Sequence, residues 1–273
     1  MKIAMQATFP QHGIAERLTL YRELGIEELD LQLDREHPDL TTDVRVFLQQ
    51  AAGLGIPARA VSPPWGWVAR ALKDPGEVDR LIKFIQEAPA LGTHRVMLSC
   101  SMAKVPTPAD VKAHLEALRR VYHPVMEVAE SVGVDVCTHT SSQVSETLFS
   151  TVELIDMFLD AMGSRRHKLI ACCGCLSVAG WNVPALIHHW RDRIGAVHLF
   201  NPKGGRGGFE EMRFDAGQLN IFEVMRALHE IDFRGAIIPH EYPPFRGESG
   251  REISDGWVAG YLRGLRQAVT YGG

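Results

Sequence analysis

The sequence predicts one (β/α)8 barrel that spans residues 1–273. Short apolar runs alternate with amphipathic helical segments from one end of the chain to the other. The alternation gives eight strand–helix units, and 273 residues agree with the ~250 residues typical of such a barrel. No linker-like change in composition divides the chain, so a single domain is expected. The alternative is a doubly wound open sheet, but Thr8–Gln11 lacks the glycine-rich turn that often follows its first strand.

Each predicted strand is a short apolar run that ends at Gly, Pro or polar residues. The first four predicted strands are Ile3–Thr8, Glu28–Leu33, Pro57–Ser62 and Arg95–Cys100, and the last four end at His139, Cys172, near Phe200 and at Glu241. The predicted helices cover Gly13–Leu24, a segment from Thr42, Val78–Ala90, Pro108 to about Val132, Val152–Met162, Val183–Arg191, Ile221–Ile231 and Gly256–Val269.

Capping residues support several of the helix boundaries. Gly25 is expected to stop the first helix, and Thr41 and Asp43 offer N-cap oxygens to the second. Thr107 followed by Pro108 predicts the start of the longest helix, because proline has no N–H to leave unbonded at the first helical position.

Composition narrows the functional classes. With 29 basic and 33 acidic residues and no basic run, nucleic acid is not an expected partner. No apolar run approaches the ~20 residues of a membrane span, and Met1–Ala4 resembles a strand rather than a leader. The five cysteines lie at or near predicted strand ends, which favours free thiols in a reducing compartment. A cytoplasmic protein is therefore expected.

Four predicted strands end in residues that bind metals or move protons. These residues are His139, Cys172, His198 and the pair His240/Glu241. Because the C-terminal ends of parallel strands meet at one rim of a barrel, we expect the side chains to converge there. Mixed nitrogen, sulfur and oxygen ligands suit Zn, Mn, Fe or Co better than Mg or Ca. The structural alternative for each histidine is an ordinary hydrogen-bonded residue.

The cysteines near residue 172 are expected to differ in role. Cys172 is last in its strand and is predicted as a metal ligand, although a nucleophilic thiol is a competing role. Cys173 is expected to face the opposite way and Cys175 to lie in the loop past Gly174, so both are predicted to be packing residues. For His240 and Glu241, one is expected to complete the metal shell and the other to exchange a proton with substrate. Glu241 is preferred as the ligand because a carboxylate balances the charge of the metal.

A glycine-rich segment, residues 201–214, follows the strand that carries His198. It is predicted to be a mobile loop that serves as a lid or an anion clamp, and the alternative is a solvated connector. Asn201, Lys203 and Arg206 are its candidate substrate-binding residues.

The C-terminal half resembles a known family. The resemblance is carried by Cys172-Cys-Gly-Cys-Leu, Asn182-Val-Pro-Ala-Leu-Ile, Arg193-Ile-Gly-Ala-Val-His198-Leu-Phe-Asn201-Pro-Lys203, Phe214-Asp-Ala-Gly217 and Phe233-Arg-Gly-Ala-Ile-Ile-Pro239. These segments are similar to those of the mannonate dehydratases, enzymes of the xylose isomerase-like TIM-barrel superfamily. The similarity extends over residues 134 to 270. The family's His-Pro-Asp-Asp-Pro-Pro motif stands here as His139-Thr-Ser-Ser-Gln143, without its two acidic residues.

The resemblance implies a function and a cofactor. Family members bind Mn²⁺ through His, Cys, His and Asp and dehydrate a sugar acid to a 2-keto-3-deoxy acid. By resemblance, His139, Cys172 and His198 are the first three ligands, and Glu241 or His240 is the fourth. The expected activity is a metal-dependent dehydratase acting on a sugar acid, with Mn²⁺ first and Zn, Fe or Co as alternatives. A sugar isomerase or epimerase of the same superfamily is the second hypothesis, and a barrel that binds ligands without catalysis is the third. Analogy with other barrels adds the expectation of a homo-oligomer.

Overall fold

Eight parallel strands form a closed barrel in the computed structural model, which describes residues 1–10, 14–36, 38–239 and 250–272. Around the barrel the strands follow the order β1-β10-β7-β6-β5-β4-β3-β2. Their bounds are β1 Lys2–Phe9, β2 Glu28–Leu33, β3 Ala58–Ser62, β4 Arg95–Leu98, β5 Asp135–His139, β6 His167–Cys172, β7 Ile194–Leu199 and β10 Ala236–Pro239. The predicted (β/α)8 barrel is confirmed.

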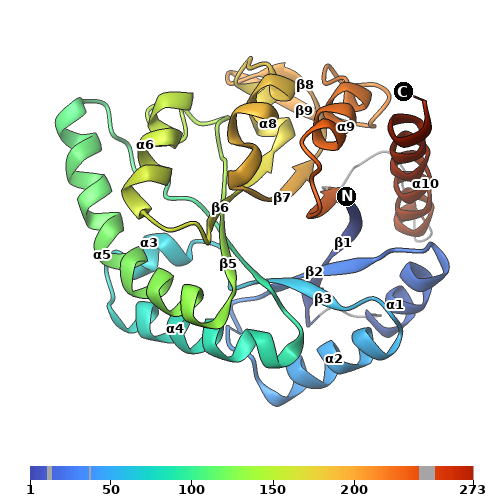
Figure 1. Cartoon of the computed structure of the whole chain (residues 1–273), viewed down its shortest axis with the longest axis horizontal. Coiled ribbons are helices and arrows are strands. Elements are labelled where there is room, and N and C mark those ends of the chain that lie inside the picture. The colour runs from blue at the N-terminus through green and yellow to red at the C-terminus, as the bar shows by residue number, and fades with distance from the viewer. Residues whose placement is uncertain (11–13, 37, 240–249, 273) are drawn as a thin grey trace.

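Helices surround the barrel on its outside, as Figure 1 shows. Their bounds are α1 Ile14–Glu23, α2 Thr42–Gly53, α3 Trp67–Ala71, α4 Gly76–Glu87, α5 Pro108–Val132, α6 Val152–Met162, α7 Cys173–Val178, α8 Val183–Trp190, α9 Ile221–Glu230 and α10 Gly250–Tyr271. Short 3₁₀ turns, Ala88–Leu91 and Arg191–Arg193, follow α4 and α8. Among the described residues, no helix is both long and apolar enough to cross a membrane.

Regular structure also occurs where the sequence predicted loops. Helix α7 begins directly after β6, so that Cys173, the residue after the strand, is already helical. The segment predicted as a mobile loop instead contains an antiparallel hairpin, β8 Asn201–Gly205 and β9 Gly208–Met212. Gly204 makes the hairpin possible, because its φ of 117° and the close approach of Gly208 O exclude a side chain there. The hairpin replaces the irregular loop that the sequence predicted, and its role as a lid, an anion clamp or a solvated connector stays a prediction.

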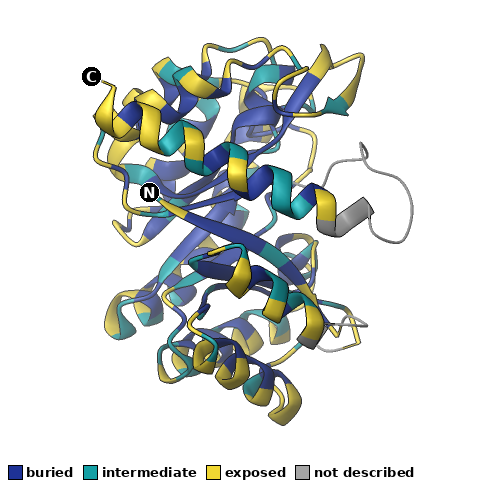
Figure 2. Cartoon of the chain, turned by 90° about the vertical axis from the view of Figure 1, so that its right-hand side faces the viewer, coloured by how far each residue is buried: buried dark blue, intermediate teal, exposed yellow. Residues whose placement is uncertain are grey.

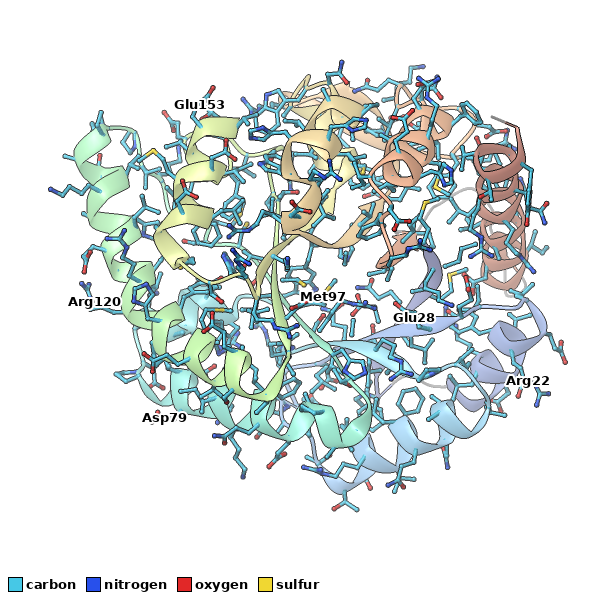
Figure 3. The ribbon with its side chains drawn as sticks, in the orientation of Figure 1. Arg22, Glu28, Asp79, Met97, Arg120 and Glu153 are labelled. Atoms are coloured by element: carbon cyan, nitrogen blue, oxygen red, sulfur yellow. The ribbon has the colours of Figure 1, made fainter. Side chains whose placement is uncertain are left out.

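Apolar side chains pack on both faces of the barrel wall, inside the barrel and between its strands and the helices. Small and medium side chains pack inside it, namely Ala4, Ala60, Met97, Cys137, Ile170, Ala196, Ala236 and Ile238. Figure 3 places Met97 in the middle of the ring of strands, whereas Arg22, Asp79, Arg120 and Glu153 lie on the outer helices. A larger cluster fills the layer between strands and helices, and Figure 2 shows the buried strands beneath helices whose outer faces are exposed. All five cysteines carry free thiols, as the sequence predicted.

A buried histidine at the start of β6 is predicted to make the fold sensitive to acid. The His167 ring packs against Tyr122 and Phe158 and shares a 3.0 Å hydrogen bond with Thr138 Oγ1. Burial, helped by the charge of Arg193, lowers the pKa of His167 to about 3. The unfolded chain therefore takes up a proton between about pH 6.5 and pH 3 that the folded chain does not. The free energy of unfolding should therefore fall as the pH is lowered through this range, by about 2 kcal/mol from pH 7.5 to pH 5.

Urea unfolding of the wild type and of His167→Gln at both pH values measures this contribution. We expect the difference between the two pH values to shrink by about 2 kcal/mol in the variant. The exposed His229→Gln variant serves as the control and should keep the wild-type difference. An unchanged acid response in His167→Gln would assign the sensitivity to other groups.

The start of the longest helix is fixed by a reciprocal cap. Thr107 Oγ1 accepts a hydrogen bond from Asp110 N, and the Asp110 carboxylate accepts one from Thr107 N. Thr107→Ala should lower the free energy of unfolding by about 1 kcal/mol, because Asp110 N loses the hydroxyl that accepts its hydrogen bond. Chemical denaturation measures the change, and Ser131→Ala on the exposed end of the same helix should have a smaller effect. Equal losses in the two variants would contradict a special role for the cap.

Candidate metal centre

Three neighbouring strands carry the candidate ligands to one end of the barrel. His139 ends β5, Cys172 ends β6 and His198 is next to last in β7. Cys172 pairs directly with His198 across the β6–β7 ladder, and the rings of His139 and His198 lie 5.2 Å apart. All three side chains are buried. The structure thus brings together the three strand-end residues that the sequence singled out.

Cys175 joins this group, although the sequence analysis made it a packing residue. The Cys175 and Cys172 sulfur atoms are 3.2 Å apart, and one ligand atom from each of His139, Cys172 and Cys175 lies within 4.8 Å of the other two. The reason is helix α7, which places residue 175 one turn after residue 172 on the same side. The prediction that Cys175 lies in a loop is wrong, while Cys173 is buried and its thiol approaches Ala171 O.

Backbone packing at α7 requires the glycine between the cysteines. A Cβ at Gly174 would lie 2.4 Å from the Phe200 ring, so the helix can approach β7 closely only without a side chain. Phe200 in turn packs with Cys172 and Cys175 in one small apolar cluster. The two sulfur atoms are therefore held in a water-poor setting with fixed geometry.

Hydroxyl groups orient His139 and Cys172. The Ser141 hydroxyl lies 2.9 Å from His139 Nδ1 and leaves Nε2 as the other ring nitrogen for a ligand. Thr140 Oγ1 donates to Ile170 O and accepts from Cys172 N, so one side chain joins the ends of β5 and β6. Thr140 and Ser141, the two residues that follow His139, thus position the cluster.

The electrostatics favour a thiolate at Cys172. Burial opposes ionisation, but a hydrogen bond from the Cys175 thiol and the charge of His139 outweigh it, so the pKa of Cys172 lies well below its usual value. The bond to Cys172, together with burial, raises the pKa of Cys175. Burial alone would lower the pKa of His139, but the Cys172 charge and bonds to Cys100 and Cys172 raise it to about 10. The thiolate is the form in which cysteine binds metals.

Asp30 on β2 is a site residue that sequence reasoning missed. Its Oδ2 lies 3.9 Å from His198 Nε2, and both side chains are almost fully buried. Burial raises the pKa of Asp30 to about 6, against the opposing charge of Arg95. The signal was present in the alternating run Glu28–Leu33, whose polar members face the inside of a barrel.

The predicted substrate-binding residues occupy different surroundings. Lys203 is exposed on the β8–β9 hairpin. Arg206 donates to Ser142 O and Ser150 O at 3.0 and 2.7 Å and lies over the Trp181 ring. Asn201 is buried, and its amide bonds to backbone groups of Phe214 and Leu219. These contacts show Arg206 and Asn201 tying the hairpin to the barrel, and a role in substrate binding remains a prediction.

His240 and Glu241, the predicted fourth ligand and proton-transfer residue, lie outside the described residues. Within them, an aromatic ring adjoins the cluster. Trp65, in the loop after β3, meets His139 edge-on with ring centroids 5.8 Å apart and keeps 40% of its surface exposed. Trp67 is instead buried against Tyr122. Trp65 is therefore the tryptophan placed to contact a ligand near the cluster.

The strands form a closed parallel barrel, and imidazole and thiol groups gather at their C-terminal ends. These two features place the protein among the TIM barrels that carry a candidate metal centre at this end. The chain belongs to the xylose isomerase-like TIM-barrel family, whose sequence model matches residues 18–261. This membership confirms the superfamily that the sequence segments indicated.

Individual relatives agree with this membership. Mannonate dehydratase of Streptococcus agalactiae serotype III is 28% identical over 163 residues, which cover 54% of this chain and 47% of the relative. The crystal structure of mannonate dehydratase from Streptococcus suis serotype 2 superposes with a TM-score of 0.80 at 14% identity, over 98% of this chain and 93% of that one. D-psicose 3-epimerase of Clostridium cellulolyticum H10, solved with D-tagatose, superposes with a TM-score of 0.69 at 16% identity, over 99% and 97%. The chain therefore spans about half the length of the curated relative, and the structural matches show a shared fold.

Proposed function

We propose that the protein is a metal-dependent enzyme that dehydrates a sugar acid or a related polyhydroxy carbonyl compound. The observation that supports it is that His139, Cys172 and His198 are neighbours at one end of a closed barrel. Relatives named mannonate dehydratase match about half of the chain. The donor set suits a divalent transition ion, because it offers imidazole nitrogen and an ionised sulfur within one buried cluster.

The residues have distinct roles in this proposal. His139 and Cys172 hold the ion, with His198 beside them, and the ion supplies Lewis-acid polarisation of the substrate's oxygen atoms. Trp65 offers an apolar face beside His139 for a sugar-sized ligand. The cations Lys203 and Arg206, on the hairpin that follows β7, attract the substrate carboxylate. The proton leaves the α-carbon to His240 or Glu241, whichever does not bind the ion.

Incubation with a panel of sugars and sugar acids tests the proposal. A dehydratase should convert one sugar acid to a 2-keto-3-deoxy acid and release one water molecule, which mass spectrometry and a 2-keto acid assay detect. The Cys172→Ala variant should give no product, and the Cys173→Ala variant should retain activity. Turnover that leaves the substrate mass unchanged would contradict dehydration.

An isomerase or epimerase is the second candidate. It is favoured by superposition on sugar epimerases over almost the whole chain, including L-ribulose 3-epimerase with a TM-score of 0.72. In this case a group beside the ion moves a proton between neighbouring carbons. Turnover in ordinary water should then leave the mass unchanged, and turnover in deuterium oxide should add deuterium from the solvent to the product. A barrel that binds sugars without catalysis would show saturable binding with neither product.

A further inference from the structure

The two sulfur atoms at the end of β6 indicate a metal site that differs from the one the sequence predicted. Two ligands of the same ion cannot be further apart than twice the bond length, about 4.6 Å for zinc and thiolate sulfur. Cys172 and Cys175 are 3.2 Å apart, well inside that limit, and His139 offers its nitrogen within 4.8 Å of both. The three donors can therefore face one ion with small rotations of their side chains.

The chain is built so that these donors stay together. Cys172 is the residue before α7, and Cys175 follows within the first turn of that helix. Because Gly174 has no side chain, this turn can pack closely against Phe200. Phe200 forms one apolar cluster with Cys172 and Cys175. Ser141 fixes the His139 ring, and Thr140 fixes the backbone of Cys172. Such supporting contacts are typical of residues that ligate a metal.

We propose that Cys175 is a second sulfur ligand, so that His139, Cys172 and Cys175 bind the ion and select Zn²⁺, or Co²⁺ in its place, over Mn²⁺. The inference rests on the proposed metal-dependent function, to which it adds Cys175 as a ligand and Zn²⁺ or Co²⁺ as the preferred ion. Two sulfur donors and an imidazole favour borderline and soft ions, whereas Mn²⁺ prefers carboxylate, carbonyl and water oxygen. A site with one cysteine among oxygen ligands would not have this preference.

Cobalt substitution tests the inference directly. Thiolate-to-cobalt charge transfer absorbs in the near ultraviolet, and its intensity grows with the number of sulfur ligands. We expect the band of the Co²⁺-loaded wild type to fall by about half in Cys175→Ala, and Zn²⁺ affinity to fall at least tenfold while Mn²⁺ affinity changes little. Cys173→Ala is the matched control, a neighbouring buried thiol whose removal should leave both readings unchanged.

Cobalt-edge X-ray absorption of the wild type counts the sulfur ligands without any substitution, so a variant that fails to fold does not decide the matter. Two sulfur ligands support the inference. One sulfur ligand, or a charge-transfer band unchanged in Cys175→Ala, overturns it and leaves the proposed function standing. If the protein binds none of the ions Co²⁺, Zn²⁺ and Mn²⁺, both this inference and the proposed function are overturned.

Discussion

Replacing Cys172 with alanine is expected to remove bound metal from the protein. Cys172 is the donor whose pKa is lowered, so it supplies the negative charge that an ion in this buried cluster requires. Changes to residues that merely support a ligand typically cost 10- to 100-fold in metal affinity, and loss of the thiolate itself should cost more than about 100-fold. Elemental analysis after dialysis against trace metal should show stoichiometric ion in the wild type and little in the variant.

Cys173→Ala separates this effect from damage to the fold. Cys173 is equally buried and adjacent in sequence, but its thiol approaches Ala171 O and lies outside the His139–Cys172–Cys175 group. It should therefore retain the metal. A Cys172→Ala protein that keeps its full metal content, with a wild-type circular dichroism spectrum, would exclude Cys172 as a ligand.

Replacing Asn201 with alanine is expected to destabilise the fold by about 3 kcal/mol or more. The Asn201 amide nitrogen donates to Phe214 O and Leu219 O at 2.7 and 3.0 Å, and its oxygen accepts from Leu219 N at 2.7 Å. Alanine leaves these three backbone groups buried without that partner, and each unsatisfied buried group costs about 1–3 kcal/mol. The free energy of unfolding in urea measures the loss.

Two comparisons make the Asn201 result specific. Asn220→Ala removes an exposed helix cap and should cost about 1 kcal/mol. Asn201→Asp keeps an acceptor for Leu219 N but loses both donors, so it should resemble the alanine variant. Unchanged stability with weaker substrate binding would instead support the substrate-binding role that the sequence suggested for Asn201.

The barrel could be predicted because its evidence is local and repeated. Each strand is a short apolar run, and caps such as Thr107 and stops such as Gly25 fix the helix boundaries. The proximity of His139, Cys172 and His198 followed from the same logic, since residues at the C-terminal ends of neighbouring strands must share one rim.

The remaining site features depend on three-dimensional packing that sequence spacing does not encode. Whether Cys175 lies in a loop or in a helix depends on Gly174 packing against Phe200, which is 26 residues away in the chain. Asp30 meets His198 only because the barrel closes between β1 and β10 and brings the two halves of the chain together. The hairpin at residues 201–212 was hidden because its glycines indicate flexibility and a tight strand connection equally well.

The Arg206 contacts have a consequence for how a ligand reaches the cluster. A single guanidinium on the tip of the β8–β9 hairpin grips two carbonyls in the segment after β5. The hairpin and the segment after β5 are thereby held together, and we expect them to move as one unit. We expect a ligand to approach His139 past the exposed part of Trp65, so that contact with this ring influences which sugars bind.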